Sequence, residues 1–460
     1  MPSIGQTTPG DWRYVSEGGA TIVFSYRGPD NPNFNGTVLR LRKALVPVFR
    51  KRSNTIEDAS ARPDTLDEEE PDDPTIEYQT KCMSRLIPLE HLPRLETVDL
   101  DRDWLERLVA SQNLNRPEVR RGKDGIDVNR KKGVLATDLV GGNWLAVEIK
   151  PKWAFLPGTT HLSESTKPVK TQTCRFCMHN HLRTTKGTIV PMAYCPLDLF
   201  SEDEERMKTA VNALWDSWTE SEGTVNNLKV FAHGKMLHPA DAKLMVSPDF
   251  TAEAGIQAIR DAFTSSIVLT LKATPVLSIL SKLQRTLDTL DIEGLSKLWR
   301  HTELSAPLYR TTFAEFFNSR ETDDRTGPPS TPLGVSSLFL SSPEPSIPDW
   351  VGFLDSYLSP FSSQLDHANP TPKDLRYYLL AYLLSATFKD CSVIVRLDFL
   401  RPNSEPKIEI KPNTVTVIDL DPKSMDKLRG WEKLDKEIAT IYAKNTQKRT
   451  CVDANSINPT

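Results

Sequence analysis

The sequence predicts an α+β protein with a small β-rich N-terminal lobe and a larger mixed α/β C-terminal lobe that carries insertions. Residues 11–50 consist of short β-branched and aromatic runs separated by glycine turns. Beyond residue 80, apolar residues recur mainly at helical spacing, between a few strand-like runs. The length of 460 residues is enough for about two to three domains.

The N-terminal lobe, residues 1–138, begins with the pattern of a β-hairpin. The runs WRYV and ATIVFSY flank the turn at residues 16–19, and Gly36 precedes a third strand, TVLRLRK. Residues 53–76 are acidic and contain almost no large apolar side chains. Because such a segment buries too little surface to offset its ordering entropy, we expect a disordered insertion there.

The C-terminal lobe, residues 139–445, alternates helical and strand-like patterns. Its helices are expected at 202–219, 256–265, 275–300 and 372–388, with a final helix from about Lys423, and a helical pattern around 80–112 precedes them in the N-terminal lobe. The strand-like runs are VLATDLV, WLAVEIK, CSVIVRLDF and TVTVIDLD. Residues 321–348 have the composition of a Pro/Ser-rich insertion, and residues 446–460 that of a polar tail.

Composition excludes several classes of protein. A net charge of −4 does not fit a polycation made for nucleic acid. The longest apolar stretch, residues 377–388, falls short of the roughly 20 residues that a bilayer requires, and no signal peptide is expected. Six cysteines are too sparse for a disulfide scaffold, so they indicate reduced intracellular thiols or metal ligands.

Two N-terminal features suit a nucleotide. Gly18, Gly19 and Ala20 lie between two strands, where glycines let backbone N–H groups approach a phosphate; the alternative is a simple hairpin turn. Arg40 lies in the third strand, where a cation would hold phosphate, although a solvated strand residue fits the pattern too.

The end of WLAVEIKPK gathers charges. Strand alternation would place Glu148, Lys150 and Lys152 on one face, which suits a polyphosphate with a metal or nucleotide. An exposed edge strand is the alternative, since Pro151 suits an edge.

Cys174, Cys177 and Cys195, together with His181, have the spacing of a structural zinc site. A helix from Cys177 would place His181 one turn further on the same face, with His179 as the alternative third ligand. Free thiols with core histidines remain the competing interpretation.

Two aspartates border neighbouring strand-like runs. Asp390 precedes CSVIVRLDF and Asp419 follows TVTVI, which suits a proton acceptor and a Mg²⁺ ligand for phosphoryl transfer. Lys423 and Lys427 would follow on one helix face. Each aspartate alone is more typical of a turn or cap residue.

Over nearly its whole length the chain resembles the inositol-pentakisphosphate 2-kinase family. The resemblance rests on six motifs that occur in this order: VEIKPKWAFLP, CRFCMHNHLR, YCPLDLFS, VNNLKVF, KDCSVIV and VIDLDPKSM. The resemblance implies a fold distantly like that of protein kinases. It also implies transfer of the ATP γ-phosphate, with Mg²⁺, to the 2-hydroxyl of inositol pentakisphosphate. We expect a monomer in the nucleus and cytoplasm that binds neither membrane nor nucleic acid.

The resemblance also assigns roles to residues. Gly18, Gly19 and Ala20 would cover the ATP phosphates, and Arg40, Glu148 and the hinge segment with Asp138 would contact the nucleotide. Asp390 would accept the hydroxyl proton and Asp419 would bind Mg²⁺. The inositide ligands would be Arg120, Lys150, Lys152, Arg183, Asn226, Asn227, Lys423, Lys427 and Trp431.

Three positions depart from the family pattern. Thr21 stands where asparagine is usual, and Leu45 stands where an arginine is often found, so that either Lys43 substitutes or the contact is lost. Trp431 replaces a usual tyrosine and also fits the apolar stripe of the last helix. Plant relatives lack the Cys174–Cys177 pair, so a zinc site here would not be common to the family.

Three other functions compete with this interpretation. A protein kinase would require HRD and DFG motifs, and neither is present. A zinc-knuckle RNA-binding protein would require aromatic residues interleaved with basic ones around the cysteines, where Phe176 stands alone. An inactive inositide-binding scaffold would not need both Asp390 and Asp419.

Overall fold

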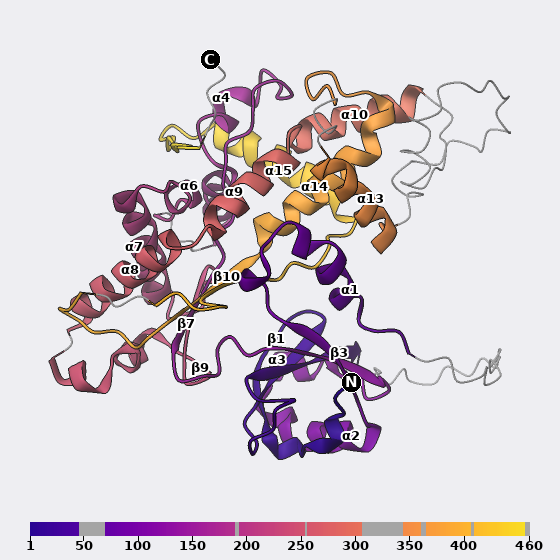
Figure 1. The fold of residues 1–460 in the computed structure, drawn as a ribbon. Coiled ribbons are helices and arrows are strands. Elements are labelled where there is room, and N and C mark those ends of the chain that lie inside the picture. Colours follow the sequence, from indigo (N-terminus) through magenta and orange to yellow (C-terminus); the bar gives the residue numbers. More distant parts are fainter. Residues whose placement is uncertain are drawn as a thin grey trace, which may run out of the picture. The chain divides into compact units, whose positions relative to one another are not determined.

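The protein is mixed α+β with antiparallel sheets, as predicted, and divides into two compact units (Figure 1). The computed structural model describes residues 1–45, 70–188, 193–253, 255–305, 344–359, 365–405 and 409–455. The first unit comprises Met1–Glu77, Pro93–Trp144 and Ala232–Lys235, and the second comprises Tyr78–Leu92, Leu145–Phe231 and Met236–Thr460. The division therefore falls after Trp144 rather than after residue 138, and Tyr78–Leu92 belongs to the second unit.

The first unit is built on an antiparallel sheet with strand order β1-β2-β3-β6-β4, to which β5 adds on β3. The hairpin and third strand predicted from the glycine pattern are confirmed. A strand not predicted, β4, lies where a helical pattern was expected. The strands are β1 (Trp12–Glu17), β2 (Thr21–Tyr26), β3 (Thr37–Leu45), β4 (Leu95–Asp99), β5 (Asp124–Ile126) and β6 (Lys132–Thr137).

Aromatic side chains form the core of this unit. Trp12, Phe24 and Phe34 are fully buried and pack with Trp104 of α2 (Arg102–Gln112). The helix begins where the side chain of Asp101 accepts a hydrogen bond from the Trp104 amide, as an N-cap should. A short helix, α3 (Glu118–Arg121), follows.

The acidic segment ends earlier than expected. Residues 53–69 lie outside the described part of the chain, but residues 70–76 are placed. Glu70 pairs with Arg130 at 2.7 Å, Asp73 binds Arg42 through both carboxylate oxygens, and α1 (Pro74–Lys81) begins directly afterwards. The prediction of disorder was therefore wrong for 70–76. It assumed that the acidic side chains are solvated, whereas Glu70, Asp72 and Asp73 each pair with a basic side chain.

The second unit contains an antiparallel sheet with the order β11-β10-β7-β8-β9. Its strands are β7 (Leu145–Ile149), β8 (Leu228–Ala232), β9 (Lys235–Met236), β10 (Ser392–Leu397) and β11 (Val415–Ile418). Ile149 lies opposite Val393, and Ser392 lies opposite Ile418. Because β7 is a central strand with every residue buried, the edge-strand alternative is wrong.

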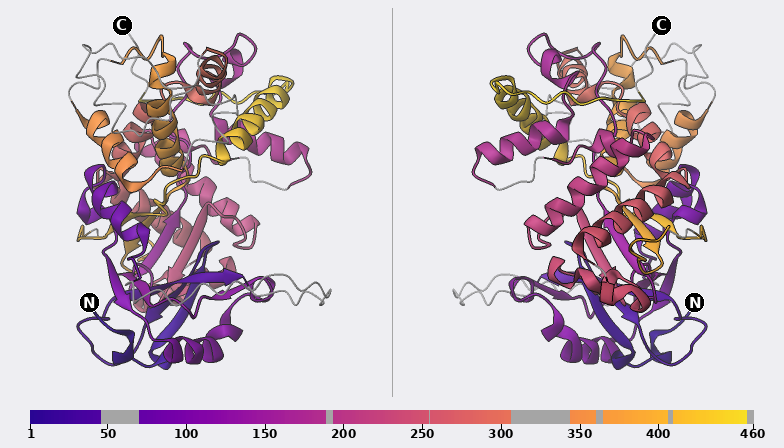
Figure 2. Two further views of the ribbon diagram at one scale, coloured as in Figure 1. Left: turned by 90° about the vertical axis from the view of Figure 1, so that its right-hand side faces the viewer. Right: turned by 90° about the vertical axis from the view of Figure 1, so that its left-hand side faces the viewer.

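Helices make up most of the rest of the second unit, and α14 packs against α9, α10 and α13 (Figure 2). Two expected boundaries were wrong. The 275–300 helix is two helices separated by residues 288–290, the second beginning at Asp291 with a φ of +57°, and the last helix begins at Lys427. The helices are α4 (Lys167–Lys170), α5 (Arg175–Thr185), α6 (Pro196–Leu199), α7 (Glu204–Glu220), α8 (Ile256–Lys272), α9 (Val276–Leu287), α10 (Asp291–Ser305), α13 (Ile347–Leu358), α14 (Leu375–Asp390) and α15 (Lys427–Ala443).

The expected insertion 321–348 also ends sooner than its composition suggested. Residues 321–343 lie outside the described chain, whereas Glu344 accepts hydrogen bonds from Ser424 and Met425, and Ser346 caps α13. In the described residues no single helix has the length and apolarity to cross a membrane, although α8 and α9–α10 meet that test as a bent pair.

A buried lysine joins three segments of the second unit. Lys170, whose side chain is 2% exposed, pairs with Asp291 of α10 and with Asp435 of α15 at 2.8 Å. Arg175 reaches the other oxygen of Asp435 at 3.0 Å. Burial raises the pKa of Asp291 to about 6, against the opposing attraction of Lys170. Removing the lysine would therefore leave two carboxylates in the interior without their main cation.

We predict that Lys170→Ala lowers the free energy of unfolding by about 3–5 kcal/mol, because breaking one side of a buried ion network leaves uncompensated charge. The matched control is Lys167→Ala on the same short helix, since the Lys167 side chain is 41% exposed and pairs only loosely with Glu164 at 3.7 Å. Denaturant unfolding of both variants measures the difference. Equal midpoints for the two variants would show that the network does not hold the fold.

Candidate active site

The chain brings charged residues together at one edge of the second sheet. Lys150 follows the end of β7, Asp390 ends α14 just before β10, and Asp419 follows the end of β11. Since β10 runs antiparallel to both neighbours, these three positions lie at the same edge. The prediction that the two aspartates border neighbouring strands is confirmed.

Asp390 is held by two lysines from different segments. Lys152 Nζ lies 3.0 Å from one of its carboxylate oxygens, and Lys423 Nζ lies 2.9 Å from the other. The carboxylate nevertheless keeps 54% of its side-chain surface exposed. Burial alone would raise the pKa of Asp390, but the two ammonium groups outweigh it and lower the pKa to about 2. The group is therefore an ionised, accessible carboxylate.

Asp419 has a separate set of partners. Lys150 Nζ lies 3.0 Å from its Oδ2, and Ser392 Oγ donates to the same oxygen at 2.9 Å. Burial opposes the charge, but Lys150 and Ser392 keep the pKa of this carboxyl below its usual range. The backbone of Asp419 has a φ of +62°, which turns the chain sharply after β11. The same Ser392 hydroxyl lies 3.0 Å from a Glu148 carboxylate oxygen, so its one hydrogen is shared between the two carboxylates, and Glu148 pairs with Lys229.

The strand alternation that predicted a shared face for Lys150 and Lys152 does not continue past β7. Lys152 has a φ of +68°, so the two lysines diverge, one to Asp419 and one to Asp390. Asn227 fixes this segment: its backbone carbonyl accepts from the Lys150 amide at 3.0 Å, and its side chain donates to the Lys150 carbonyl at 3.1 Å. Asn226 beside it is exposed.

A buried glutamine that the sequence did not single out joins the segment of Lys152 to the segment of Asp390. Gln284 of α9 donates to the carbonyls of Lys152 and Phe388, each at 3.0 Å, and accepts from the Ala154 amide at 2.9 Å. Both N–H donors and the carbonyl oxygen of its side chain are thus used on the two segments that carry Lys152 and Asp390. A lone glutamine in an amphipathic helix gives no sequence signal for this role.

Cations also gather along α5. The pKa of His179 falls to about 4, first because the ring is buried and then because Arg175, Arg183, Lys186 and Lys152 repel a positive imidazolium. Arg183 is exposed on this helix. Four basic groups therefore act on His179, and a cluster of cations suits a ligand that carries several phosphates.

The remaining expected inositide ligands lie in and just before the last helix, α15, and differ in exposure. Lys423 precedes α15 and Lys427 begins it, so the prediction that they share a helix face was wrong. Lys427 is exposed. Trp431 is half-buried, and its ring centroid lies 6.1 Å from that of Tyr382. This contact favours its interpretation as part of the apolar stripe of the last helix, although part of the indole stays accessible.

In the first unit, the glycine loop has the openness that a phosphate requires. The Gly18 amide donates to the Thr21 carbonyl at 2.9 Å, which closes the hairpin. A Cβ added at Gly18 or Gly19 would meet nothing within 4 Å, and neither backbone needs a positive φ. The space beside both glycines is therefore open. Arg120 donates to the Gly18 carbonyl at 2.8 Å and so belongs to this loop.

Two other first-unit expectations change. Lys43 is buried in an ion cluster with Glu17, Arg116 and Asp124, so it is committed to the fold rather than free to replace the arginine missing at Leu45. Asp138 is buried as well: its carboxylate accepts from Ser25 and from the amides of the next turn. Its side chain is therefore structural. Arg40 lies in β3 opposite Val23 and Val134.

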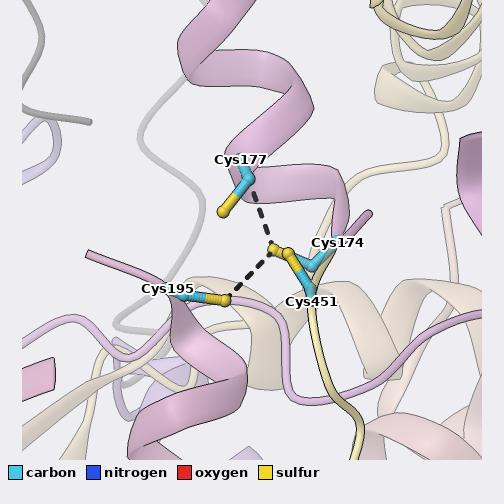
Figure 3. Close-up of side chains that lie close together, drawn as sticks. All are labelled: Cys174, Cys177, Cys195 and Cys451. Atoms are coloured by element: carbon cyan, nitrogen blue, oxygen red, sulfur yellow. Dashed lines mark hydrogen bonds between the residues drawn. The ribbon is translucent and has the colours of Figure 1, made fainter. Parts of the chain in front are cut away.

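The proposed zinc ligands meet only in part. Cys174, Cys177 and Cys195 are brought together, but the fourth member of the cluster is Cys451, not His181 (Figure 3). His181 instead packs edge-on against Tyr442, with ring centroids 5.4 Å apart. His179 is not in the cluster either. The assignment of His181 was wrong because the chain closes the site from a segment 256 residues after Cys195, which no local spacing reveals.

Comparisons with known proteins agree with the motifs. The model of the inositol-pentakisphosphate 2-kinase family matches residues 14–437. A curated inositol-pentakisphosphate 2-kinase of Cryptococcus neoformans is 33% identical, covering 94% of this chain and 93% of its own length. Those of rice and zebrafish are 27% and 26% identical, each covering 95% of this chain and 94% of their own. The chain therefore belongs to the inositol-pentakisphosphate 2-kinase family.

Proposed function

We propose that this chain transfers the γ-phosphate of ATP to the 2-hydroxyl of inositol 1,3,4,5,6-pentakisphosphate, giving inositol hexakisphosphate. The observation that carries the proposal is the meeting of Asp390 and Asp419 with Lys150, Lys152 and Lys423 at one sheet edge. Phosphoryl transfer needs a proton acceptor, a carboxylate suited to a metal, and cations for the phosphates, and this edge supplies all three.

The roles divide by partner. Asp390 orients the substrate hydroxyl and accepts its proton while the oxygen bonds to the γ-phosphorus and the bond to ADP breaks. Asp419 would hold Mg²⁺, because carboxylate oxygens are the ligands this ion prefers and half of the side chain is exposed. Bound there, Mg²⁺ would neutralise charge on the ATP phosphates.

The two lysines paired with Asp390 control when this carboxylate is basic enough to accept a proton. A carboxylate with a pKa near 2 is a weak base, and it is weak because Lys152 and Lys423 are paired with it. Phosphates of the inositide compete for the same ammonium groups, and each such charge-assisted bond is strong. Substrate binding therefore draws the lysines away and raises the pKa of Asp390 toward the range of a useful base.

Two further elements of the proposal concern the fold. The two units would act as the small and large lobes of a distantly kinase-like enzyme, with the glycine loop and Arg40 of the first unit on the nucleotide. The open space beside Gly18 and Gly19 supports this role. The zinc-knuckle RNA-binding alternative has no support, because the chain belongs to the inositol-pentakisphosphate 2-kinase family.

The activity itself is tested by incubating the protein with ATP, Mg²⁺ and inositol pentakisphosphate and resolving the products by anion exchange.

We expect Asp390→Asn to lower kcat by roughly 10²–10⁴-fold, because the near-isosteric amide cannot accept a proton. Calorimetric affinities for both substrates should stay within a few-fold. Asp419→Asn should instead weaken Mg²⁺-dependent nucleotide binding. Near-normal single-turnover rates in Asp390→Asn would remove it as the base.

Lysine removal separates the substrate-binding groups from surface charge. We expect Lys152→Ala and Lys423→Ala to raise the KM for the inositide by about tenfold or more, with the KM for ATP nearly unchanged, because each loses a charge-assisted contact to phosphate. Lys208→Ala on α7 is the control, since Lys208 pairs only with Glu204 and Glu205 at the surface. A defect confined to ATP would move these lysines to the nucleotide side.

His179 reports the positive potential directly. In the free protein its pKa of about 4 keeps the imidazole neutral at pH 6. Bound inositol hexakisphosphate, the proposed product, supplies negative charge that stabilises the imidazolium, so NMR titration should show the pKa rising. Lys152→Ala should also raise it in the free protein, and Lys208→Ala should not. A pKa that stays near 4 in the saturated complex would place the inositide elsewhere.

A further inference from the structure

The segment that follows β7, residues 150–156, forms neither helix nor strand. Side chains from elsewhere in the second unit take up its backbone hydrogen bonds instead. Asn227 donates to the Lys150 carbonyl at 3.1 Å. The buried Tyr194 hydroxyl donates to the Pro151 carbonyl at 2.9 Å. Because buried peptide groups have to be paired, these side chains determine the path of the segment.

Gln284 of α9 holds the middle of this segment. The residue is 0% exposed, and its side-chain oxygen accepts from the Ala154 amide at 2.9 Å. Its side-chain nitrogen donates to the carbonyls of Lys152 and Phe388, each at 3.0 Å. Phe388 lies two residues before Asp390, at the end of α14. One nitrogen atom therefore bridges the segment of Lys152 and the segment of Asp390.

The backbone of Lys152 needs this support. Its φ of +68° lies in the left-handed region, which is costly for a residue other than glycine and persists only where the surroundings hold it. Gln284 binds the carbonyl of Lys152 and the amide of Ala154, which belong to the next two peptide bonds. The same backbone conformation places Lys152 Nζ 3.0 Å from the Asp390 carboxylate. Gln284 therefore stabilises the conformation that directs this lysine to the proton acceptor.

A second contact joins the same two segments close to Gln284. The Lys389 ammonium group lies 4.1 Å from the centre of the Trp153 ring, and it pairs with Asp288, one turn beyond Gln284. Ser385 of α14 donates to the backbone carbonyl of Gln284 at 3.0 Å. The end of α14 is thus held against α9 at two successive turns, which keeps Gln284 in place between its partners.

The far end of the segment 150–156 is tied to α9 as well. Arg285 binds the Asp453 carboxylate through both terminal nitrogens, at 2.8 and 3.0 Å. The same carboxylate accepts from the Leu156 amide at 2.9 Å. The expectation of a polar tail was therefore wrong for residues 446–455, while 456–460 lie outside the described chain.

We propose that Gln284 is a positioning residue, which holds Lys152 beside Asp390 and so fixes the proton acceptor relative to an inositide-binding cation. The proposal rests on the proposed kinase activity, in which Asp390 takes the hydroxyl proton and Lys152 binds phosphate. A side chain without exposed surface cannot reach a substrate, so Gln284 acts through the two segments that it joins. It keeps the Lys152 backbone fixed while the ammonium group exchanges Asp390 for phosphate.

Gln284→Met tests the proposal, because methionine has a similar length and fills the space without making the three hydrogen bonds. We expect kcat to fall by about tenfold to a hundredfold, since small displacements of reacting groups are costly. Calorimetry should show weaker inositide binding and unchanged ATP binding. The control is Thr264→Val, which removes the buried 2.8 Å hydrogen bond from Thr264 to Asn212, between α8 and α7. It should lower stability without lowering kcat. Wild-type kcat in Gln284→Met would overturn the proposal.

A double-mutant cycle separates positioning from general destabilisation. Gln284→Met should lower kcat much less in the Asp390→Asn background than in the wild type, because a proton acceptor that is already lost has no position to lose. In the Lys152→Ala background it should likewise weaken inositide binding little further. Fully additive effects in both backgrounds would show that Gln284 does not act through these residues.

The pairing of Lys152 with Asp390 can also be measured without turnover. In the free protein Lys152 and Lys423 lower the pKa of Asp390 to about 2. NMR titration of Gln284→Met should show this pKa raised, because Lys152 is no longer held in place, and Thr264→Val should leave it near 2. An unchanged pKa in Gln284→Met would overturn the positioning role. A raised pKa in a chain whose wild type lacks kinase activity would support the positioning role and overturn only the proposed function.

A milder variant keeps the proposal testable if Gln284→Met does not fold. Gln284→Asn retains the uncharged amide but is one methylene shorter, so it cannot reach all three backbone partners. It should change kcat and the pKa of Asp390 in the same directions as Gln284→Met. Wild-type values of both quantities in Gln284→Asn would contradict the proposal.

Discussion

The pairing of β10 with β7 on one side and β11 on the other is the constraint on which the candidate site depends. Because all three strands are antiparallel neighbours, the end of β7, the start of β10 and the end of β11 meet at one edge. Lys150 and Asp419, 269 positions apart, and Lys152 and Asp390, 238 positions apart, are thereby placed within hydrogen-bonding distance. A one-residue slip in either pairing would turn every side chain of the slipped strand to the other face of the sheet. It would also separate each lysine from its carboxylate.

Balanced charge explains how such a site exists in a protein of net charge −4. Each aspartate at the sheet edge is paired with lysine, and the deeper lysines are paired as well, with Lys389 beside Asp288 and Lys170 between Asp291 and Asp435. Lys389 also lies 4.1 Å from the centre of the Trp153 ring, on the segment that follows Lys152. In these ion pairs the carboxylates offset the repulsion among the clustered lysines before any phosphate binds.

The sequence predicted what depends on local pattern and missed what depends on distant contacts. The hairpin, β7, β10, β11, α7 and α14 follow from alternation, helical spacing and capping residues. The family motifs located Asp390, Asp419, Lys150 and Lys152. Their pairing could not be predicted, because the turns with positive φ at Lys152 and Asp419 are set by tertiary structure.

The same distinction explains the missed residues. Cys451 and Gln284 act across more than a hundred positions of sequence, and neither lies in a motif. The acidic residues 70–73 resembled a solvated run because their partners, among them Arg42 and Arg130, lie elsewhere in the chain. Periodicity cannot distinguish a charge that meets water from one that meets an opposite charge.

Under the proposed function, the ion pairs at Asp390 also protect ATP. A kinase that binds ATP before its acceptor must avoid activating water in place of the hydroxyl. With both oxygens of Asp390 bound to lysine and its pKa near 2, the carboxylate has little capacity to take a proton from water. Only a ligand with several phosphates competes for both lysines at once. The base therefore becomes effective when the correct acceptor is bound, so the interaction that recognises the substrate also permits the chemical step.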